Sequence, residues 1–258
     1  MMEAQARHKA SALFTGWDQT MIWSCLDGTM EQIIVDDDRD PQAALALIGI
    51  SSAFAFFAGQ PDMKLVATAV DSCPDLIMVP QTPAWAQLIE KYCGDRVRKF
   101  TRYATRKDTQ FDQAKLQTLI SQLPPEFQIR PIDANLYEQC LQMEWSNDLV
   151  GNFHTYDEFN RLALGYVVVK DQQIVAGASS FSAYQGGIEI EVITHADFRG
   201  QGLATSACSQ LITTCLAQKR YPSWDAHTKI SLRLAQKLGY QLAYEYLAYE
   251  LEEKPSPF

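Results

Sequence analysis

Hydrophobic and polar positions follow a regular order in the second half of the chain. Apolar residues recur every three to four positions in residues 203–215, which predicts an amphipathic helix. Segments rich in β-branched and aromatic residues, separated by polar or glycine turns, predict strands. These predicted strands are residues 127–132, 166–170, 174–181, 188–194 and 240–251. The order of strands and helices predicts an α/β fold with a mixed sheet.

Two further helical regions are predicted in this half. The first covers residues 135–145 and continues intermittently to Leu164. The second follows a short strand around Trp224 and begins at Thr228, because a threonine hydroxyl is typical of a helix N-cap. Gly239 ends this second helix, since glycine readily adopts the left-handed conformation found just beyond helix ends.

The first half of the chain is less regular but also alternates strands with helices. Residues 75–79 predict a short buried strand, and Pro83 opens an amphipathic helix that ends near Gly94. Residues 96–107 alternate basic and apolar positions, as a half-exposed strand does. This half is therefore expected to form a second αβ lobe.

A domain boundary is predicted where two prolines follow each other. A helix over residues 111–123 stops at Pro124-Pro125, because the residue before a proline avoids the helical conformation. We therefore expect an N-terminal αβ lobe over residues 1–124 and a second domain over residues 125–258.

An uncharged apolar run lies between Pro41 and Pro61. Asp40-Pro41 is typical of a helix start, so residues 43–58 are expected to form a short helix that turns into a buried strand. A membrane span needs about twenty apolar residues, and this run is shorter and contains Gly49 and two serines. No membrane insertion is therefore expected.

Composition and charge narrow the class of protein. The chain has 22 basic and 31 acidic residues, for a net charge of −9, so nucleic acid is not expected as a partner. The basic strand of residues 96–107 is instead expected to be a solvated strand edge, or to receive an acidic substrate. The six cysteines form no C-x-x-C pair, which predicts reduced thiols in the cytoplasm and no metal site.

The segment most informative about chemistry is residues 191–205, EVITHADFRGQGLAT, in which a predicted strand runs through a glycine turn into a helix. Such a turn collects unpaired backbone N–H groups at the positive end of a helix dipole, and it therefore binds phosphate. The Rossmann fingerprint is incomplete because Thr205 stands where its third small residue belongs, and no G-K-[ST] ending of a P-loop follows. A diphosphate is the expected ligand.

Two motifs resemble those of the GNAT superfamily of N-acetyltransferases. Arg199, Gly202 and Ala204 fit its R/Q-x-x-G-x-G/A signature after a strand. Residues 224–240, WDAHTKISLRLAQKLGY, are similar to its second signature of a strand, N-x-x-S and a helix ending in K-x-G-F/Y. The resemblance covers residues 127–251, and the extra N-terminal half resembles the zwittermicin-resistance-type subgroup.

This resemblance implies a GNAT-like acyl-CoA N-acyltransferase fold with acetyl-CoA held where the sheet splays apart. Backbone donors near Ile193 and Thr194 would polarise the thioester, and the pantetheine arm would pass Thr228 and Ser231. The pyrophosphate would bind the backbone of Arg199, Gly200, Gln201, Gly202, Leu203, Ala204 and Thr205.

The proton of the attacking amine needs an acceptor, and a carboxylate reached directly or through water is suitable. Glu189 and Glu191 lie two residues apart on one predicted strand and therefore share a face. Either is a candidate base, and either could instead be a solvated or ion-paired strand residue.

The chain also departs from the family pattern. Thr228 replaces the usual asparagine, and Ala235 stands where a tyrosine often protonates the leaving thiolate. Water or Tyr240 is the expected substitute. His195 is expected at the rim of the cofactor site, and Cys208 and Cys215 as packing residues.

The expected function is that of a cytoplasmic transferase, an acetyl-CoA-dependent N-acetyltransferase that acetylates an amine of a small molecule or peptide. The N-terminal lobe would bind the acceptor side. The alternative, favoured by the missing tyrosine, is a catalytically silent acyl-CoA-binding regulatory module. The sequence does not indicate the acceptor or the oligomeric state.

Overall fold

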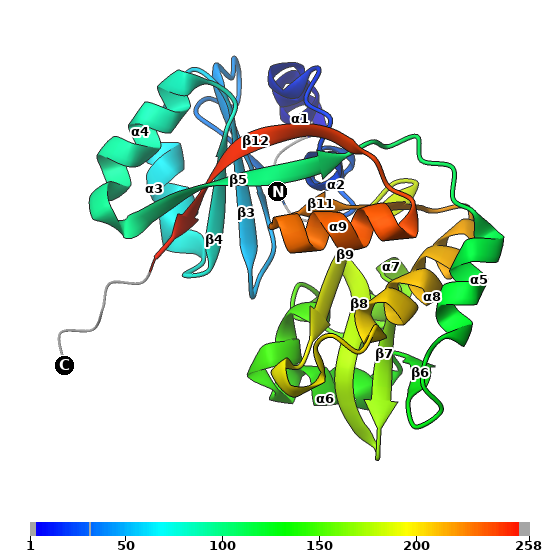
Figure 1. Cartoon of the computed structure of the whole chain (residues 1–258). Coiled ribbons are helices and arrows are strands. Elements are labelled where there is room, and N and C mark those ends of the chain that lie inside the picture. The colour runs from blue at the N-terminus through cyan, green and yellow to red at the C-terminus, as the bar shows by residue number, and fades with distance from the viewer. Residues whose placement is uncertain (1–3, 31, 253–258) are drawn as a thin grey trace, which may run out of the picture. The chain divides into compact units, whose positions relative to one another are not determined.

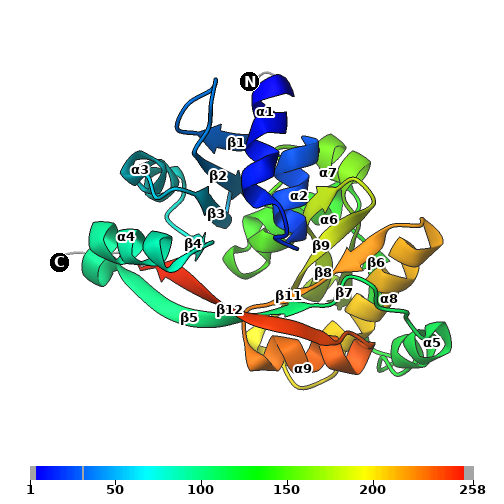
Figure 2. The ribbon, with the colours of Figure 1, turned by 90° about the horizontal axis from the view of Figure 1, so that it is seen from above.

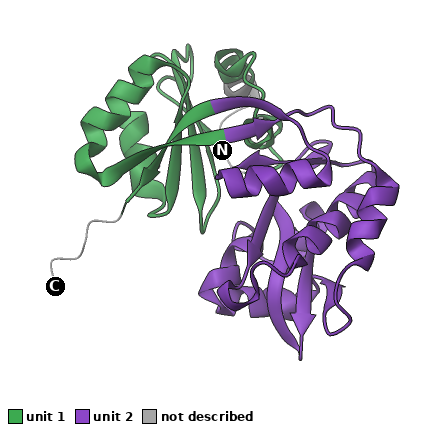
Figure 3. Cartoon of the chain, in the orientation of Figure 1, with its two compact units in different colours: residues 1–102, 246–258 green, residues 103–245 purple. Residues whose placement is uncertain are grey.

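The computed structural model describes residues 4–30 and 32–252 and divides the chain into two compact units (Figure 3). Unit 1 comprises residues 1–102 and 246–258, and unit 2 comprises residues 103–245. The chain thus begins in unit 1, forms unit 2, and returns to unit 1 through its last strand. The two long strands β5 (Val97–Thr105) and β12 (Leu242–Leu251) are each divided between the units.

The domain boundary predicted at Pro124-Pro125 lies inside unit 2. Helix α5 (Gln113–Ser121), which precedes these prolines, packs against helix α8 (Leu203–Ala217). Ser206 of α8 donates a side-chain hydrogen bond to the carbonyl of Leu119, 3.0 Å away. The helix before the prolines is therefore part of the same core as the residues after them.

Unit 1 is built on a mixed sheet. Its strands β2 (Ala43–Ile48) and β3 (Ala53–Gly59) form an antiparallel hairpin, and β4 (Leu76–Pro80) runs parallel to β3. Strand β1 (Gln32–Val35) pairs with β2 at one edge. The full strand order is β1-β2-β3-β4-β12-β5-β11, in which β11 (Asp225–Ala226) belongs to unit 2.

Helices cover both faces of this sheet (Figures 1 and 2). On one face, α3 (Met63–Ser72) and α4 (Pro83–Cys93) pack against alternate residues of β2, β3 and β4. On the other, Trp17 contacts Phe56 edge to face, with ring centroids 5.7 Å apart. This second face is covered by α1 (Ala4–Ser11), the 3₁₀ helix η1 (Ala12–Phe14) and α2 (Thr20–Asp27).

The helix predicted after Asp40-Pro41 does not form. Residues 43–48 are strand β2, and the N–H groups of Gln42 and Ala43 donate to the carboxylate of Asp36, at 3.0 and 2.9 Å. The apolar run is thus two strands with both faces covered, which explains why it carries no charge. Among the described helices, none combines the length and the apolar character that a bilayer span requires.

Unit 2 contains a second sheet, of order β10-β9-β8-β7-β6. Strands β6 (Gln128–Pro131), β7 (Gly165–Lys170), β8 (Gln173–Tyr184) and β9 (Gly187–Thr194) are antiparallel neighbours. The short strand β10 (Tyr221–Ser223) runs parallel to β9, and β11 (Asp225–Ala226) pairs with β5 instead. These strands confirm the mixed sheet that the hydrophobic pattern predicts.

The second sheet also has helices on both faces. Helices α5 and α8 lie together on one face (Figure 1). Side chains of α8 and α9 (Lys229–Leu238) belong to one hydrophobic core. The other face is covered by α6 (Ala134–Gln142), the 3₁₀ helix η3 (Glu144–Leu149) and α7 (Tyr156–Leu162). The short 3₁₀ helices η2 (Gly94–Arg96) and η4 (Ala196–Phe198) precede β5 and α8.

Candidate active site

The sheet of unit 2 opens between β9 and β10. The two strands pair only from Tyr221 with Gly187 to Ser223 with Glu189. The next residue, Trp224, offers its carbonyl to the hydroxyl of Thr105, 2.6 Å away, and β11 then joins β5. Strand β9 continues without β10 from residue 190 to 194, so that one of its edges is open, as the resemblance implied.

The register of β8 and β9 decides which backbone groups face this opening. The N–H of His195 donates to the carbonyl of Val175, 3.0 Å away. Hydrogen-bonding directions alternate along an antiparallel strand, so Ile193 also bonds toward β8, while Val192 and Thr194 point to the open edge. Of the two expected thioester donors, the N–H of Thr194 faces the opening and that of Ile193 does not.

The side chains of β9 also divide between two faces. Ile188 and Ile190 belong to the core that α8 covers. Glu189 and Glu191 therefore share the opposite face, the one against η3. Ser179, the partner of Glu191 on β8, donates its hydroxyl to the carbonyl of Leu149 in η3, 2.5 Å away. The predicted common face of the two carboxylates is confirmed.

The two carboxylates have different surroundings. Glu189 is 3% exposed and lies between Ser182 on β8 and Ser223 on β10, its partners in the two registers. Glu191 is only partly buried, and its carboxylate accepts a hydrogen bond from the N–H of Val192, 3.0 Å away. Because that N–H points to the open edge, the Glu191 carboxylate lies at the opening.

The glycine turn after β9 has the predicted conformation. Gly200 and Gly202 have φ angles of 79° and 81°, a left-handed conformation that favours glycine. Helix α8 begins after Gly202 without a side-chain cap, and Ser206 is the first residue to bond back, to the carbonyl of Gly202 at 3.2 Å. Within the described part of the chain, the N–H groups of residues 200–205 have no hydrogen-bond partner.

These N–H groups lie at the positive end of the dipole of a 15-residue helix. A Cβ atom built on Gly200 or Gly202 would meet nothing within 4 Å, so the space in front of the turn is open. Arg199 connects the turn to the strand, since its Nε donates to the carbonyl of Thr194 at 3.4 Å. The residues expected to bind a pyrophosphate thus form an open backbone cradle at the end of β9.

Thr228 and Ser231 take part in local structure. Thr228 is the N-cap of α9, and its hydroxyl accepts the N–H of Ser231 at 3.2 Å. The hydroxyl of Ser231 accepts the indole N–H of Trp224 at 3.1 Å. The predicted helix start and the stop at Gly239, whose φ is 117°, are both confirmed.

The structure argues against Tyr240 as the acid that protonates the thiolate. Its side chain is 2% exposed and donates its hydroxyl to the carbonyl of Pro222, 2.5 Å away. Burial raises the pKa of Tyr240 far above its usual value. Ala235, where the family often has tyrosine, is fully buried in the core.

Lys237 is the lysine of the K-x-G-F/Y ending of the second motif, but the sequence assigned it no role. Its ammonium lies 3.5 Å from the hydroxyl of Thr205, in the first turn of α8. A lysine near the C-terminal end of a helix ordinarily interacts with the last carbonyls of that same helix. The position of Lys237 in α9 therefore did not predict its contact with α8.

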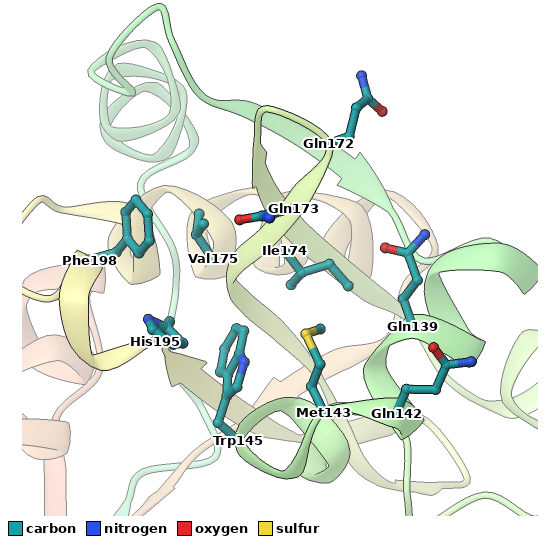
Figure 4. Close-up of a pocket in the computed structure, with 10 residues that line it drawn as sticks. All are labelled: Gln139, Gln142, Met143, Trp145, Gln172, Gln173, Ile174, Val175, His195 and Phe198. Carbon is teal, nitrogen blue, oxygen red and sulfur yellow. The ribbon is translucent and has the colours of Figure 1, made fainter.

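A pocket of about 320 Å³ lies beyond the end of β9, on the side of α6 and η3 (Figure 4). His195 meets Trp145 edge to face there, with ring centroids 5.2 Å apart, and Met143 points into the same space. The remaining lining residues are Gln139, Gln142, Gln172, Gln173, Ile174, Val175 and Phe198. None of these ten described lining residues is Asp, Glu, Lys or Arg. His195 therefore lies in an aromatic cluster with Trp145 and Phe198, between the end of β9 and the glycine turn.

No group of three or more His, Cys, Asp or Glu side chains that could hold a metal ion occurs among the described residues.

An open strand edge that leads through a glycine turn into a helix is the arrangement that the resemblance to the GNAT superfamily implied. The family model described as GNAT acetyltransferase matches residues 11–249, and the chain belongs to this family. The match extends through unit 1, beyond the residues 127–251 in which the motifs are visible.

Individual relatives agree with this assignment. A crystal structure of a GCN5-related N-acetyltransferase-like protein from Streptococcus suis is 51% identical, with a TM-score of 0.94 over 98% of this chain and 100% of that one. An uncharacterized N-acetyltransferase of Bacillus subtilis, YdfB, is 22% identical over 96% of this chain and 98% of its own. A GCN5-related N-acetyltransferase from Kribbella flavida, 14% identical with a TM-score of 0.53 over 98% of each chain, shares the fold.

Proposed function

We propose that this protein transfers the acetyl group of acetyl-CoA to an amine of a small molecule or peptide. The observation that carries the proposal is the open edge of β9. There the N–H of Thr194 and the carboxylate of Glu191 lie at the open edge of a strand that leads to the glycine turn of residues 199–205.

The turn would bind the diphosphate of CoA through its unpartnered N–H groups, and the pantetheine arm would follow the open edge of β9. Residues Val192 and Thr194 would meet the arm with their backbone groups. Thr228 and Ser231 lie at the start of α9, just after β11. They would form the wall of the pantetheine site that lies opposite the edge of β9. Their hydroxyls already support α9 and Trp224, so they would contribute mainly shape.

The chemistry requires a polarised carbonyl and a proton acceptor. The N–H of Thr194 would donate to the thioester oxygen, which gains negative charge as the amine nitrogen bonds to the carbonyl carbon. Glu191 lies three residues before that donor, a rise of ~10 Å along the strand. Its carboxylate would accept the amine proton, directly or through water. The C–S bond then breaks and CoA leaves as a thiolate, which water protonates.

We assign recognition of the acceptor to unit 1, because the family match extends through it while unit 2 already contains the elements for CoA. We place the protein in the cytoplasm, since all six cysteines are free thiols in the structure.

The test is an acetyl-CoA consumption screen across polyamines, aminoglycosides, amino acids and peptide N-termini. We expect release of free CoA that depends on one acceptor class and follows the concentration of its unprotonated amine. Calorimetry on the same preparation measures CoA affinity. CoA binding without turnover of any amine would favour the alternative, a silent acyl-CoA-binding module, and absence of CoA binding would refute both.

A further inference from the structure

Helix α9 carries an unbalanced row of positive charge. Lys229, Arg233 and Lys237 are spaced four residues apart and exposed on one side of the helix, which has no acidic residue. Like charges at this spacing destabilise a helix slightly. No described carboxylate forms an ion pair with any of the three, although the chain as a whole has a net charge of −9.

The row ends at the first turn of α8. Lys237 reaches the hydroxyl of Thr205 there, at 3.5 Å. The N-terminus of a helix is the positive end of its dipole, so it repels a cation and attracts an anion. A lysine held at this point next to the unpartnered N–H groups of residues 200–205 adds to a positive field with no described anion to balance it.

We propose that Lys237 is a phosphate ligand of CoA and that it selects donors that carry the nucleotide end of CoA. This inference rests on the proposed function, because it assigns a second, side-chain contact to the same cofactor site. A phosphate monoester carries a charge of about −1.5 to −2 at neutral pH, so an ammonium contributes a charge-assisted hydrogen bond to it. The row of Arg233 and Lys229 extends the positive field about 12 Å along α9.

The experiment compares Lys237→Gln with Lys237→Arg and with Lys115→Gln. Lys115 is an exposed lysine on α5, so its replacement removes the same charge from unit 2. Calorimetry measures binding of CoA, dephospho-CoA, adenosine 3′-phosphate 5′-diphosphate and pantetheine. We expect Lys237→Gln to weaken CoA and the nucleotide fragment about tenfold, pantetheine to be unchanged, and arginine to restore binding.

Each outcome separates this inference from the function it rests on. A loss that persists with dephospho-CoA assigns the contact to the diphosphate, and a loss confined to CoA assigns it to the 3′-phosphate. Undiminished CoA affinity in Lys237→Gln overturns the inference while leaving the function standing, as does an equal loss for pantetheine or for Lys115→Gln. A wild-type protein that does not bind CoA overturns the function itself.

Discussion

Ser223 and Glu189 form the last residue pair between β10 and β9. Both residues are buried: Ser223 has no exposed surface, and Glu189 is 3% exposed. Beyond this pair the two strands separate. The chain after β10 pairs with β5 through β11, and β9 continues along β8 to Thr194 before it reaches the glycine turn. The pair therefore marks the closed end of the opening, and Glu191, two residues nearer the turn, lies where the strand edge is already free.

This position predicts different roles for the two carboxylates. Replacement of Glu191 by glutamine removes the proton acceptor but keeps the shape, and we expect kcat/KM for the acceptor to fall by about a hundredfold or more. CoA affinity should be unchanged. The loss should shrink as the pH rises, since unprotonated amine then becomes abundant.

Glu189→Gln is the matched comparison, because it changes the buried carboxylate on the same face of the strand. We expect a smaller kinetic effect than for Glu191→Gln, with steady-state rates measured from pH 6 to 9. If Glu189→Gln has the larger effect and Glu191→Gln retains full activity, the base is Glu189.

The glycine turn predicts a loss that is specific to CoA. Gly202→Val places a branched side chain in the space in front of the turn and forces a left-handed conformation on valine, at a cost of about 1–2 kcal/mol in unfolding free energy. We expect CoA affinity to fall more than tenfold by calorimetry.

Gly186→Val provides the control. Gly186 also has a positive φ, 100°, and its Cβ would also meet open space, but it lies in the turn between β8 and β9. We expect a similar loss in urea unfolding and no change in CoA affinity. Equal CoA affinities in the two variants would show that the turn at Gly202 is not the phosphate site.

The N-cap of α9 predicts an effect on stability. Thr228→Ala removes the hydroxyl that accepts the N–H of Ser231, and we expect the free energy of unfolding to fall by about 1 kcal/mol. Thr228→Ser and Thr228→Asp keep a capping oxygen and should restore it. A variant with restored stability but weakened CoA binding would show that the threonine methyl also contacts the pantetheine arm.

The buried thiols predict slow labelling and a loss of stability at alkaline pH. Burial raises the pKa of Cys140 and of Cys215 to about 12, and also raises that of Cys208. At pH 8 roughly one thiol in ten thousand at such a pKa is ionised. We therefore expect Ellman's reagent to react with these thiols at pH 8 only after denaturation.

The same pKa shifts determine the direction of the pH dependence. The folded thiols hold their protons more tightly than unfolded ones, whose pKa is about 8.5. Their contribution to stability is therefore fully present below about pH 8.5 and is lost as the pH rises toward 12. Urea unfolding at pH 7.5 and 10 measures this, and equal stability at the two values would contradict it.

Several features were predictable from the sequence because they depend on neighbours in the chain. The turn at Gly200 and Gly202, the cap at Thr228 and the stop at Gly239 each follow from what one or two residues allow the backbone to do. The common face of Glu189 and Glu191 follows from the two-residue period of a strand.

Features that depend on distant segments were not predictable in this way. The uncharged run of residues 43–58 became two strands rather than a helix and a strand, because an apolar segment covered on both faces has no periodicity that distinguishes the two. The boundary at Pro124-Pro125 is a stop for one helix only, since the packing of α5 on α8 joins the residues on both sides.

The sequence by itself determined the family, because the motifs that indicate it need only short segments such as a glycine turn and the helix that follows it. The tertiary structure decided which groups surround that site. The pairing of His195 with Val175 turns the N–H of Thr194, and not that of Ile193, to the open edge. The packing of α9 beside α8 brings Lys237 to Thr205 across more than thirty residues of chain. Strand register and helix packing arise from contacts between distant residues, which no local pattern records.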